Sequence, residues 1–89
     1  MKVILHRSAK KFLKKCSFEL YTKTQEEVDN IVKHPRKADS LTGEFKHIRS
    51  KHFSFKGTEY RIAYVIRGDI LILLIGTREN FYQNLKRIS

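Results

Sequence analysis

YRIAYVIRGDILILLIGT, residues 60–77, is the stretch that decides the fold. Gly68 and Asp69 separate two runs rich in β-branched, aromatic and other apolar residues, a pattern typical of a tight turn between antiparallel strands. The second run, residues 70–75, is apolar at every position. Such a run predicts a strand that is covered on both faces and lies centrally in its sheet.

Two polar side chains follow this predicted hairpin. Arg78 and Tyr82 come directly after the apolar run, where a buried strand meets solvent. Strand ends are rigid supports on which small domains place polar chemistry. A core of this size does not need an arginine there, so the segment is the first candidate for a functional site.

The first half of the chain predicts one strand and two helices. Residues 2–6 alternate well enough for a strand, and Ser8 is expected to cap a short helix. Ser17 is expected to start a second helix, which should end near His34 because Pro35 disfavours a helical residue before it. The apolar stripe of the second helix comprises Tyr21, Thr24, Val28, Ile31 and Val32.

The region from Phe45 onward is β-like. Ile48 is out of phase with Phe53, so we expect a bulge or short loop within residues 49–51. A turn at residues 56–58 should lead into the decisive hairpin, and a short helix follows it. The order β-α-α-β-β-β(-α) predicts one α+β domain, residues 1–89, with a helical hairpin packed on a mostly antiparallel sheet.

Composition narrows the classes of partner and compartment. The chain has 89 residues and a net charge of +10, which favours a polyanionic partner over a neutral small molecule. Its single cysteine, Cys16, cannot form an internal disulfide and fits a reducing compartment. No zinc-like ligand spacing and no membrane-length apolar run occur in the sequence. We therefore expect a cytoplasmic protein without metal or cofactor.

Four segments carry a resemblance to a known family. They are LTG at residues 41–43, EYRIAY at 59–64, IGTRENFY at 75–82 and LKR at 85–87. In this order and spacing the chain resembles the RelE/ParE superfamily, the toxins of bacterial and archaeal toxin–antitoxin pairs. The resemblance implies a RelE/ParE-like fold over nearly the whole chain. RelE-branch members cut messenger RNA in the ribosomal A site, whereas ParE-type members inhibit DNA gyrase and lack the cutting residues.

The same resemblance implies a set of site residues. Arg61 matches the strand arginine that contacts the scissile phosphate, and Arg78 matches the arginine at the end of the last strand. Tyr82 matches the C-terminal tyrosine of RelE-like nucleases, at a spacing from the arginine that is shorter than in RelE. Where RelE-like members carry two lysines, this chain has His52 and Ser54. That departure leaves the identity of the general base open.

These residues supply the chemical types that metal-free RNA cleavage needs. A base removes the 2′-hydroxyl proton, a cation stabilises the phosphorane, and an acid protonates the leaving oxygen. His52 is the expected base or a phosphate ligand, and Arg61 and Arg78 form the expected phosphate clamp. Tyr82 is expected to stack on a base or orient the attacking hydroxyl. His47 is the reserve candidate for proton transfer.

Each assignment has a simpler structural alternative. His52 can be a solvated strand residue, and Tyr82 can pack a helix on the sheet. Arg61 can pair with Glu59 or Glu44, although exposed pairs stabilise by only about 0–1 kcal/mol. The basic residues can form an ordinary solvated surface, or they can contact RNA phosphates with salt-sensitive affinity. The expected RNA-binding set comprises His47, Arg49, Lys51, Lys56, Lys10, Lys11, Lys14 and Lys15.

The favoured hypothesis is a ribosome-dependent endoribonuclease toxin. Its expected partners are messenger RNA, the ribosome with its rRNA, and a cognate antitoxin protein of acidic character in a hetero-oligomer; no membrane partner is expected. The first alternative is a ParE-like DNA gyrase inhibitor that cuts nothing. The second is a catalytically inactive module that retains only antitoxin binding.

Overall fold

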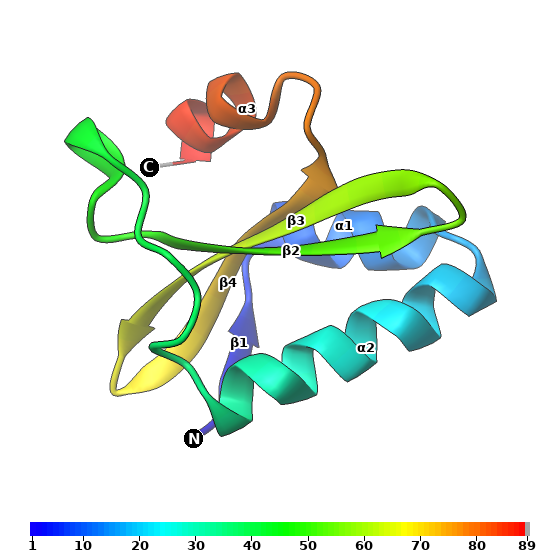
Figure 1. The fold of residues 1–89 in the computed structure, drawn as a ribbon, viewed down its shortest axis with the longest axis horizontal. Coiled ribbons are helices and arrows are strands. Elements are labelled where there is room, and N and C mark those ends of the chain that lie inside the picture. The colour runs from blue at the N-terminus through cyan, green and yellow to red at the C-terminus, as the bar shows by residue number, and fades with distance from the viewer. Residues whose placement is uncertain (89) are drawn as a thin grey trace.

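The computed structural model describes residues 1–88, and its strands form one sheet in the order β1-β4-β3-β2 (Figure 1). β1 (Val3–Leu5) runs parallel to β4 (Asp69–Thr77). β4 pairs antiparallel with β3 (Thr58–Arg67), which in turn pairs antiparallel with β2 (Arg49–Phe55). The hairpin predicted from residues 60–77 is therefore β3 and β4, the two inner strands of a mostly antiparallel sheet.

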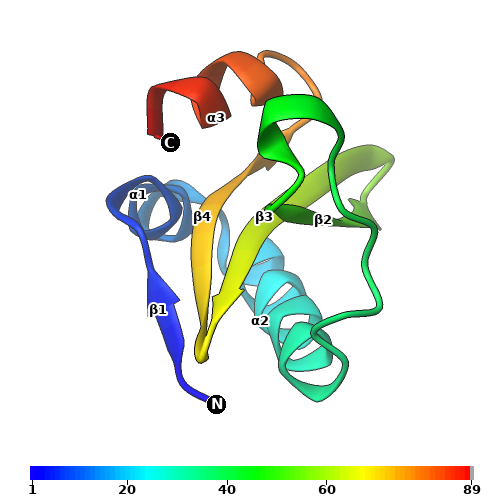
Figure 2. The ribbon, with the colours of Figure 1, turned by 90° about the vertical axis from the view of Figure 1, so that its left-hand side faces the viewer.

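Helices cover both faces of the sheet (Figure 2). α1 (Arg7–Lys15) and α2 (Phe18–Lys33) pack on one face through the first hydrophobic core. α3 (Phe81–Ile88) packs on the other face through a second core, beside the short 3₁₀ helix η1 (Gly43–Phe45). The α+β class and the helical hairpin on a small sheet are confirmed.

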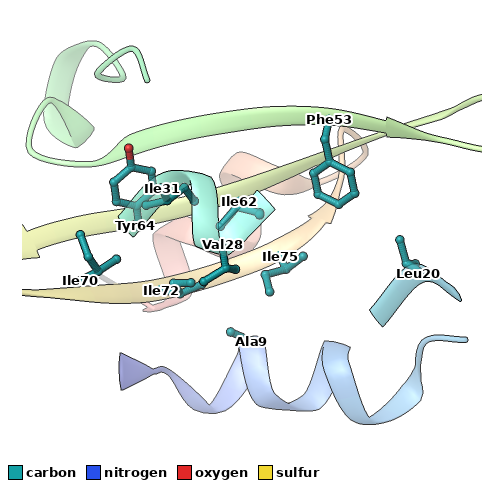
Figure 3. Packing of buried hydrophobic residues seen from close by; sticks show 10 residues of the cluster. All are labelled: Ala9, Leu20, Val28, Ile31, Phe53, Ile62, Tyr64, Ile70, Ile72 and Ile75. Carbon is teal, nitrogen blue, oxygen red and sulfur yellow. The ribbon is translucent and has the colours of Figure 1, made fainter. Parts of the chain in front are cut away.

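The apolar run of β4 contributes to both cores. The first core, between the sheet and the α1–α2 pair, contains Ala9, Leu20, Val28, Ile31, Phe53, Ile62, Tyr64, Ile70, Ile72 and Ile75 (Figure 3). The second core, beneath α3, contains Ile48, Ala63, Val65, Leu73, Leu74, Phe81 and Leu85. A strand with both faces buried needs apolar residues at every position, so the inference of a central strand is confirmed.

The predicted bulge lies in a different strand. β2 pairs with β3 without a register shift, so the expectation of a bulge within residues 49–51 was wrong. Ile48 is out of phase with Phe53 because it packs in the second core, on the other face. The shift occurs in β4, where Leu74 faces Ala63 while Ile72 faces the next β3 residue, which leaves Leu73 as the extra residue.

The predicted N-cap of α2 is confirmed, whereas the predicted N-cap of α1 was wrong. Ser17 caps α2 by accepting a hydrogen bond from the Leu20 amide at 3.2 Å. His6, not Ser8, caps α1, and its Nδ1 accepts from the Ser8 amide at 3.1 Å. Ser8 instead donates its hydroxyl to the carbonyl oxygen of Leu73, the bulged residue of β4. The Ser8 hydroxyl, which we expected to cap the helix, thus pairs with the Leu73 carbonyl, and the bulge takes Leu73 out of the regular ladder.

The turn between β2 and β3 determines which side chains face each other. Lys56 and Gly57 both have positive φ, 49° and 80°, as the two central residues of a type I′ hairpin turn require. Phe55 and Thr58 are the first pair beyond the turn. Counting back along this ladder places His52 directly opposite Arg61.

Buried polar contacts fasten the segment after α2 to the sheet. The hydroxyl of the fully buried Tyr64 donates a 2.6 Å hydrogen bond to the carbonyl oxygen of Pro35. The Arg49 Nη1 atom donates to the carbonyl oxygens of Arg36 and Ala38, at 3.1 and 2.7 Å. These bonds hold the loop beside β2 after the helix has ended at His34.

Replacing Tyr64 with phenylalanine should lower the free energy of unfolding by about 1 kcal/mol at neutral pH, because the Pro35 carbonyl loses its donor. Burial raises the pKa of Tyr64, and the Arg49 charge opposes that rise only partly. The folded pKa therefore lies above the unfolded value of about 10, so this stabilisation is present below pH 10 and is lost as the pH rises through the folded pKa.

Urea denaturation of both chains at about pH 7 and about pH 11 checks this prediction. The stability difference between the wild-type chain and Tyr64→Phe should narrow at the higher pH, because only the wild-type chain carries this hydroxyl. A difference that is equal at both pH values would contradict the assignment.

Candidate functional site

The candidate site is built on one row of residues across the sheet. His52 of β2 faces Arg61 of β3, and Arg61 faces Gly76 of β4. Paired residues project to the same side of a sheet, here the side that α3 covers. A Cβ atom added at Gly76 would meet nothing within 4 Å, so open space lies beside the arginine.

Arg61 is held by the two aromatic residues that begin α3. Its guanidinium carbon lies 5.9 Å from the ring centres of both Phe81 and Tyr82. Its Nη1 atom donates to the Tyr82 hydroxyl at 3.4 Å, while its buried Nε atom has no hydrogen-bond partner within residues 1–88. Phe81 is buried and Tyr82 is 48% exposed, so one ring anchors α3 and the other remains open to a ligand.

His52 has an acidic partner that orients its ring. The Nδ1 atom of His52 lies 3.3 Å from a carboxylate oxygen of Glu59, and both side chains are about half exposed at 48% and 56%. When Nδ1 donates to the carboxylate, the lone pair on Nε2 is left free to accept a proton. The expected alternative in which Glu59 or Glu44 pairs with Arg61 was wrong, because Glu59 pairs with the histidine and Arg61 contacts Tyr82.

Phe45 is a member of this surface that the sequence did not reveal. It ends η1, and its ring centre lies 6.5 Å from that of Tyr82 at an interplanar angle of 31°. Gly43, with φ of 67°, starts the 3₁₀ turn that carries this ring toward α3. The signal for it was indirect, since Phe45 follows the LTG segment but lies far in sequence from Tyr82.

Arg78 and His47 are not held against the His52, Arg61 and Tyr82 side chains. Arg78 follows Thr77, whose β3 partner is Tyr60, so its backbone leaves the sheet one residue pair beyond the Arg61 row. Both side chains are exposed, and neither forms a hydrogen bond or ion pair with any residue in the described part of the chain. The structure thus brings His52, Arg61 and Tyr82 together, and leaves Arg78 and His47 as free groups near that surface.

Two members of the expected RNA-binding set, Arg49 and Lys51, are half-buried and bind loop carbonyls or a buried carboxylate. Arg49 donates to the two loop carbonyls described above. Lys51 projects to the α2 side of the sheet, away from Arg61, where its Nζ atom lies 3.4 Å from a carboxylate oxygen of Glu27. Glu27 is buried and also pairs with Lys23 at 3.2 Å. A buried carboxylate needs such partners, so these cations are committed to the fold.

The other basic residues of the set are exposed. Lys56 lies at the β2–β3 turn, 4.0 Å from the carboxylate of Glu19 and 5.4 Å from the Phe55 ring centre. The exposed lysines of α1 form no ion pair within residues 1–88; they are Lys10, Lys11, Lys14 and Lys15. They give the surface of α1 a positive charge that attracts polyanions.

The described residues show no grouping of three or more His, Cys, Asp and Glu side chains that could bind a metal ion. Within residues 1–88, no helix combines the length and apolar character that crossing a membrane requires. The side chains gathered at the Arg61 row supply an imidazole, a guanidinium group, a phenol and the carboxylate of Glu59.

Comparisons with known proteins agree with this architecture. A substituted form of E. coli RelE in the free state has a TM-score of 0.75 at 18% identity, covering 98% of this chain and 96% of that one. The isolated E. coli RelE toxin has a TM-score of 0.68 at 17% identity, covering 98% and 97%. A chain of the intact E. coli RelBE toxin–antitoxin complex has a TM-score of 0.71 at 14% identity, covering 86% and 95%.

At these identities the structural likeness shows the fold alone. A comparison with curated protein sequences finds no match. The family model for the ParE-like toxin of type II bacterial toxin–antitoxin systems matches residues 3–86, nearly the whole chain. The chain therefore belongs to the ParE-like toxins of type II bacterial toxin–antitoxin systems.

Proposed function

We propose that this toxin is an endoribonuclease that cuts translated messenger RNA on the ribosome. One observation carries the proposal: His52, Arg61 and Tyr82 lie on one side of the sheet, with the Tyr82 hydroxyl 3.4 Å from the guanidinium and open space beside Gly76. The His52 imidazole can act as a base, the Arg61 guanidinium can bind phosphate, and the half-exposed Tyr82 ring can stack on a base. RNA cleavage at an unstacked nucleotide needs these three functions.

The proposed reaction needs no metal. His52 takes the proton of the 2′-hydroxyl, the 2′-oxygen bonds to phosphorus, and the bond to the 5′-oxygen breaks. Arg61 and Arg78 bind the phosphate oxygens as negative charge develops on them. The products are a 2′,3′-cyclic phosphate and a 5′-hydroxyl, whose proton comes from a donor in the ribosomal complex. A site with a single well-positioned imidazole favours such dependence on the ribosome, because it lacks a matching acid of its own.

The proposed partners follow from charge and from family membership. E. coli RelE occurs in a RelBE toxin–antitoxin complex, and we extend that arrangement to a cognate antitoxin for this chain, in a hetero-oligomer. A net charge of +10 suits an antitoxin of acidic character, and it suits rRNA and messenger RNA as further partners. A ribosomal target implies action in the cytoplasm.

A gyrase-directed toxin is the second candidate. It is favoured by the ParE-like description of the matching family and by the absence of the lysine pair that RelE-like nucleases carry. In its place stand His52, which pairs with Glu59, and Ser54. A catalytically inactive module that binds only an antitoxin is the third.

Two reporter messenger RNAs that differ only in their start codon test the proposal. After brief expression of the toxin, primer extension should find new ends within the reading frame of the translated reporter and none in the untranslated one. Growth arrest without new ends in either reporter would support the gyrase inhibitor instead. A chain that folds but causes neither arrest nor cleavage would be the inactive module.

A further inference from the structure

A hollow of about 350 Å³ lies along the outer edge of β2, next to the Arg61 row. Its volume falls in the range of small-ligand sites in proteins. Residues from the C-terminal part of α2, from the segment that follows it and from the β2 edge line the hollow. Figure 1 shows the course of the chain from the end of α2 past β2. His52 lines this hollow as well as facing Arg61, so the two features adjoin. We call it the β2-edge pocket.

The walls of the pocket are fixed before any ligand arrives. Tyr64 and Arg49 bind three carbonyl oxygens of residues 35–38, as described above. The Ser50 amide donates to the Asp39 carbonyl oxygen at 3.1 Å, and Ser40 forms a bridge with Arg49. A pre-formed pocket binds its ligand with little ordering cost.

One wall carries a polar group that the fold leaves without a partner. Ser50 is only 6% exposed, and its hydroxyl oxygen has no hydrogen-bond partner within residues 1–88. Buried hydroxyls are normally paired, so an unpaired one in the wall of a pocket is a candidate partner for a bound group. Ser50 lies two residues before His52 and so projects to the same side of β2.

The lining offers a nucleobase both apolar surface and hydrogen-bonding groups. Ile31, Leu41 and the Tyr64 ring supply apolar surface for the face of a base. Asn30 and Ser40 supply donors and acceptors for its edge. His34, Lys37, Asp39 and Lys51 also line the pocket. Lys51 is paired with Glu27, so Asp39 mainly offsets the charge of Lys37, and its carboxylate is the group in this lining that can accept a hydrogen bond from an exocyclic amino group.

We propose that the β2-edge pocket holds the nucleoside next to the scissile phosphate and selects a base that carries an exocyclic amino group. This inference rests on the proposed nuclease function and adds a specificity site to it. Asp39 accepts from the amino group, Ser50 pairs with the same base, and His52 stands between this nucleoside and the phosphate on Arg61. Uracil, which has no amino group, is the base that the pocket disfavours.

The first test maps cleavage on a translated reporter with one randomised codon. The wild-type chain should disfavour uridine at one position beside the cut by about tenfold, the effect of one lost hydrogen-bonded pair. Asp39→Asn and Ser50→Ala should lose most of that preference while still cutting. Asp29→Asn, an exposed change of equal charge on α2 outside the pocket, should keep it.

The outcomes separate the two proposals. Cuts whose base preference is unchanged in Asp39→Asn and Ser50→Ala would overturn the pocket and leave the nuclease standing. Absence of cuts by the wild-type chain would overturn the nuclease, and with it the role of the pocket in cleavage. Thermal denaturation of each variant shows whether a loss of preference reflects the pocket or the fold.

A binding measurement tests the pocket without cleavage. Isotope-labelled Arg61→Ala chain is titrated with cytidine 3′-monophosphate and, separately, uridine 3′-monophosphate. Amide shifts at Asp39, Ser40 and Ser50 that are larger with the cytidine nucleotide support the pocket. Shifts confined to the lysines of α1, or no difference between the two nucleotides, would overturn it. The proposal would also be overturned if an antitoxin peptide shifted the pocket amides and neither nucleotide did.

Discussion

Arg61→Ala is expected to lower the rate of messenger RNA cleavage by about 100- to 1000-fold, the usual effect of removing one preorganised group that stabilises transition-state charge. The phosphate would lose the only guanidinium that the fold fixes in this row, since Arg78 has no contact that positions it within residues 1–88. The fold should survive, because Arg61 is only half-buried and its contacts with Phe81 and Tyr82 contribute about 0.5–2 kcal/mol.

Two matched variants show which property of the arginine matters. Arg61→Lys keeps the charge but loses the planar fork, so it should recover only part of the lost rate. Arg67→Ala removes an equal charge from the exposed far end of the same strand and should cleave like the wild-type chain. Single-turnover cleavage of ribosome-bound messenger RNA gives the rates, and urea denaturation gives the stabilities. If Arg61→Ala cleaved at the wild-type rate, Arg61 would have no role in cleavage.

The hairpin was predictable because local signals and burial agree there. Gly68 marks the turn with φ of 73°, and the all-apolar run after it can only be stable with both faces covered. The same run concealed the β4 bulge. An extra residue reverses the alternation of faces, but where every residue is apolar that reversal leaves no trace in the sequence. The one irregularity visible in the sequence is that Ile48 is out of phase with Phe53. Its cause is not a bulge, because Ile48 packs in the second core on the other face of the sheet.

The cross-strand row was predictable from the Lys56-Gly57 turn, because a two-residue turn fixes the register of both strands. The partners of the charged residues were not. Lys51 and Arg49 share a strand with His52, yet their charges are occupied by Glu27 and by loop carbonyls. Those partners come from elements distant in sequence, whose packing no local pattern records. The RNA-binding role of Lys51 and Arg49 stays a prediction, and any contact with RNA would compete with these partners.

The placement of α3 shows the same limit. The sequence predicted a short helix after the hairpin, and α3 confirms it. It did not predict that Phe81 and Tyr82 would sit over Arg61, or that Phe45 would approach Tyr82 from η1. These contacts arise because α3 and η1, which lie far apart in the sequence, both cover the second core.

His52→Ala is expected to lower cleavage by about 100- to 10,000-fold, the range that general acid–base catalysis contributes. The imidazole lies directly across the strand pair from Arg61, the proposed phosphate ligand, which is the position from which it would accept the 2′-hydroxyl proton. Its loss should cost little stability, since it is about half exposed and its pair with Glu59 is a surface pair. Single-turnover cleavage of ribosome-bound messenger RNA by the wild-type chain and by His52→Ala measures this loss, and an unchanged rate in the variant would contradict the assignment.

Glu59→Gln separates the base from the group that orients it. The amide can still accept from Nδ1 but carries no charge, so the rate should fall by about tenfold, and less than in His52→Ala. His47→Ala is the matched control, because His47 is exposed and its side chain forms no hydrogen bond or ion pair within residues 1–88. If His47→Ala loses activity and His52→Ala keeps it, the reserve candidate is the base. If both variants cut at the wild-type rate, no imidazole of this row takes the proton and the ribosome must supply the base as well as the acid.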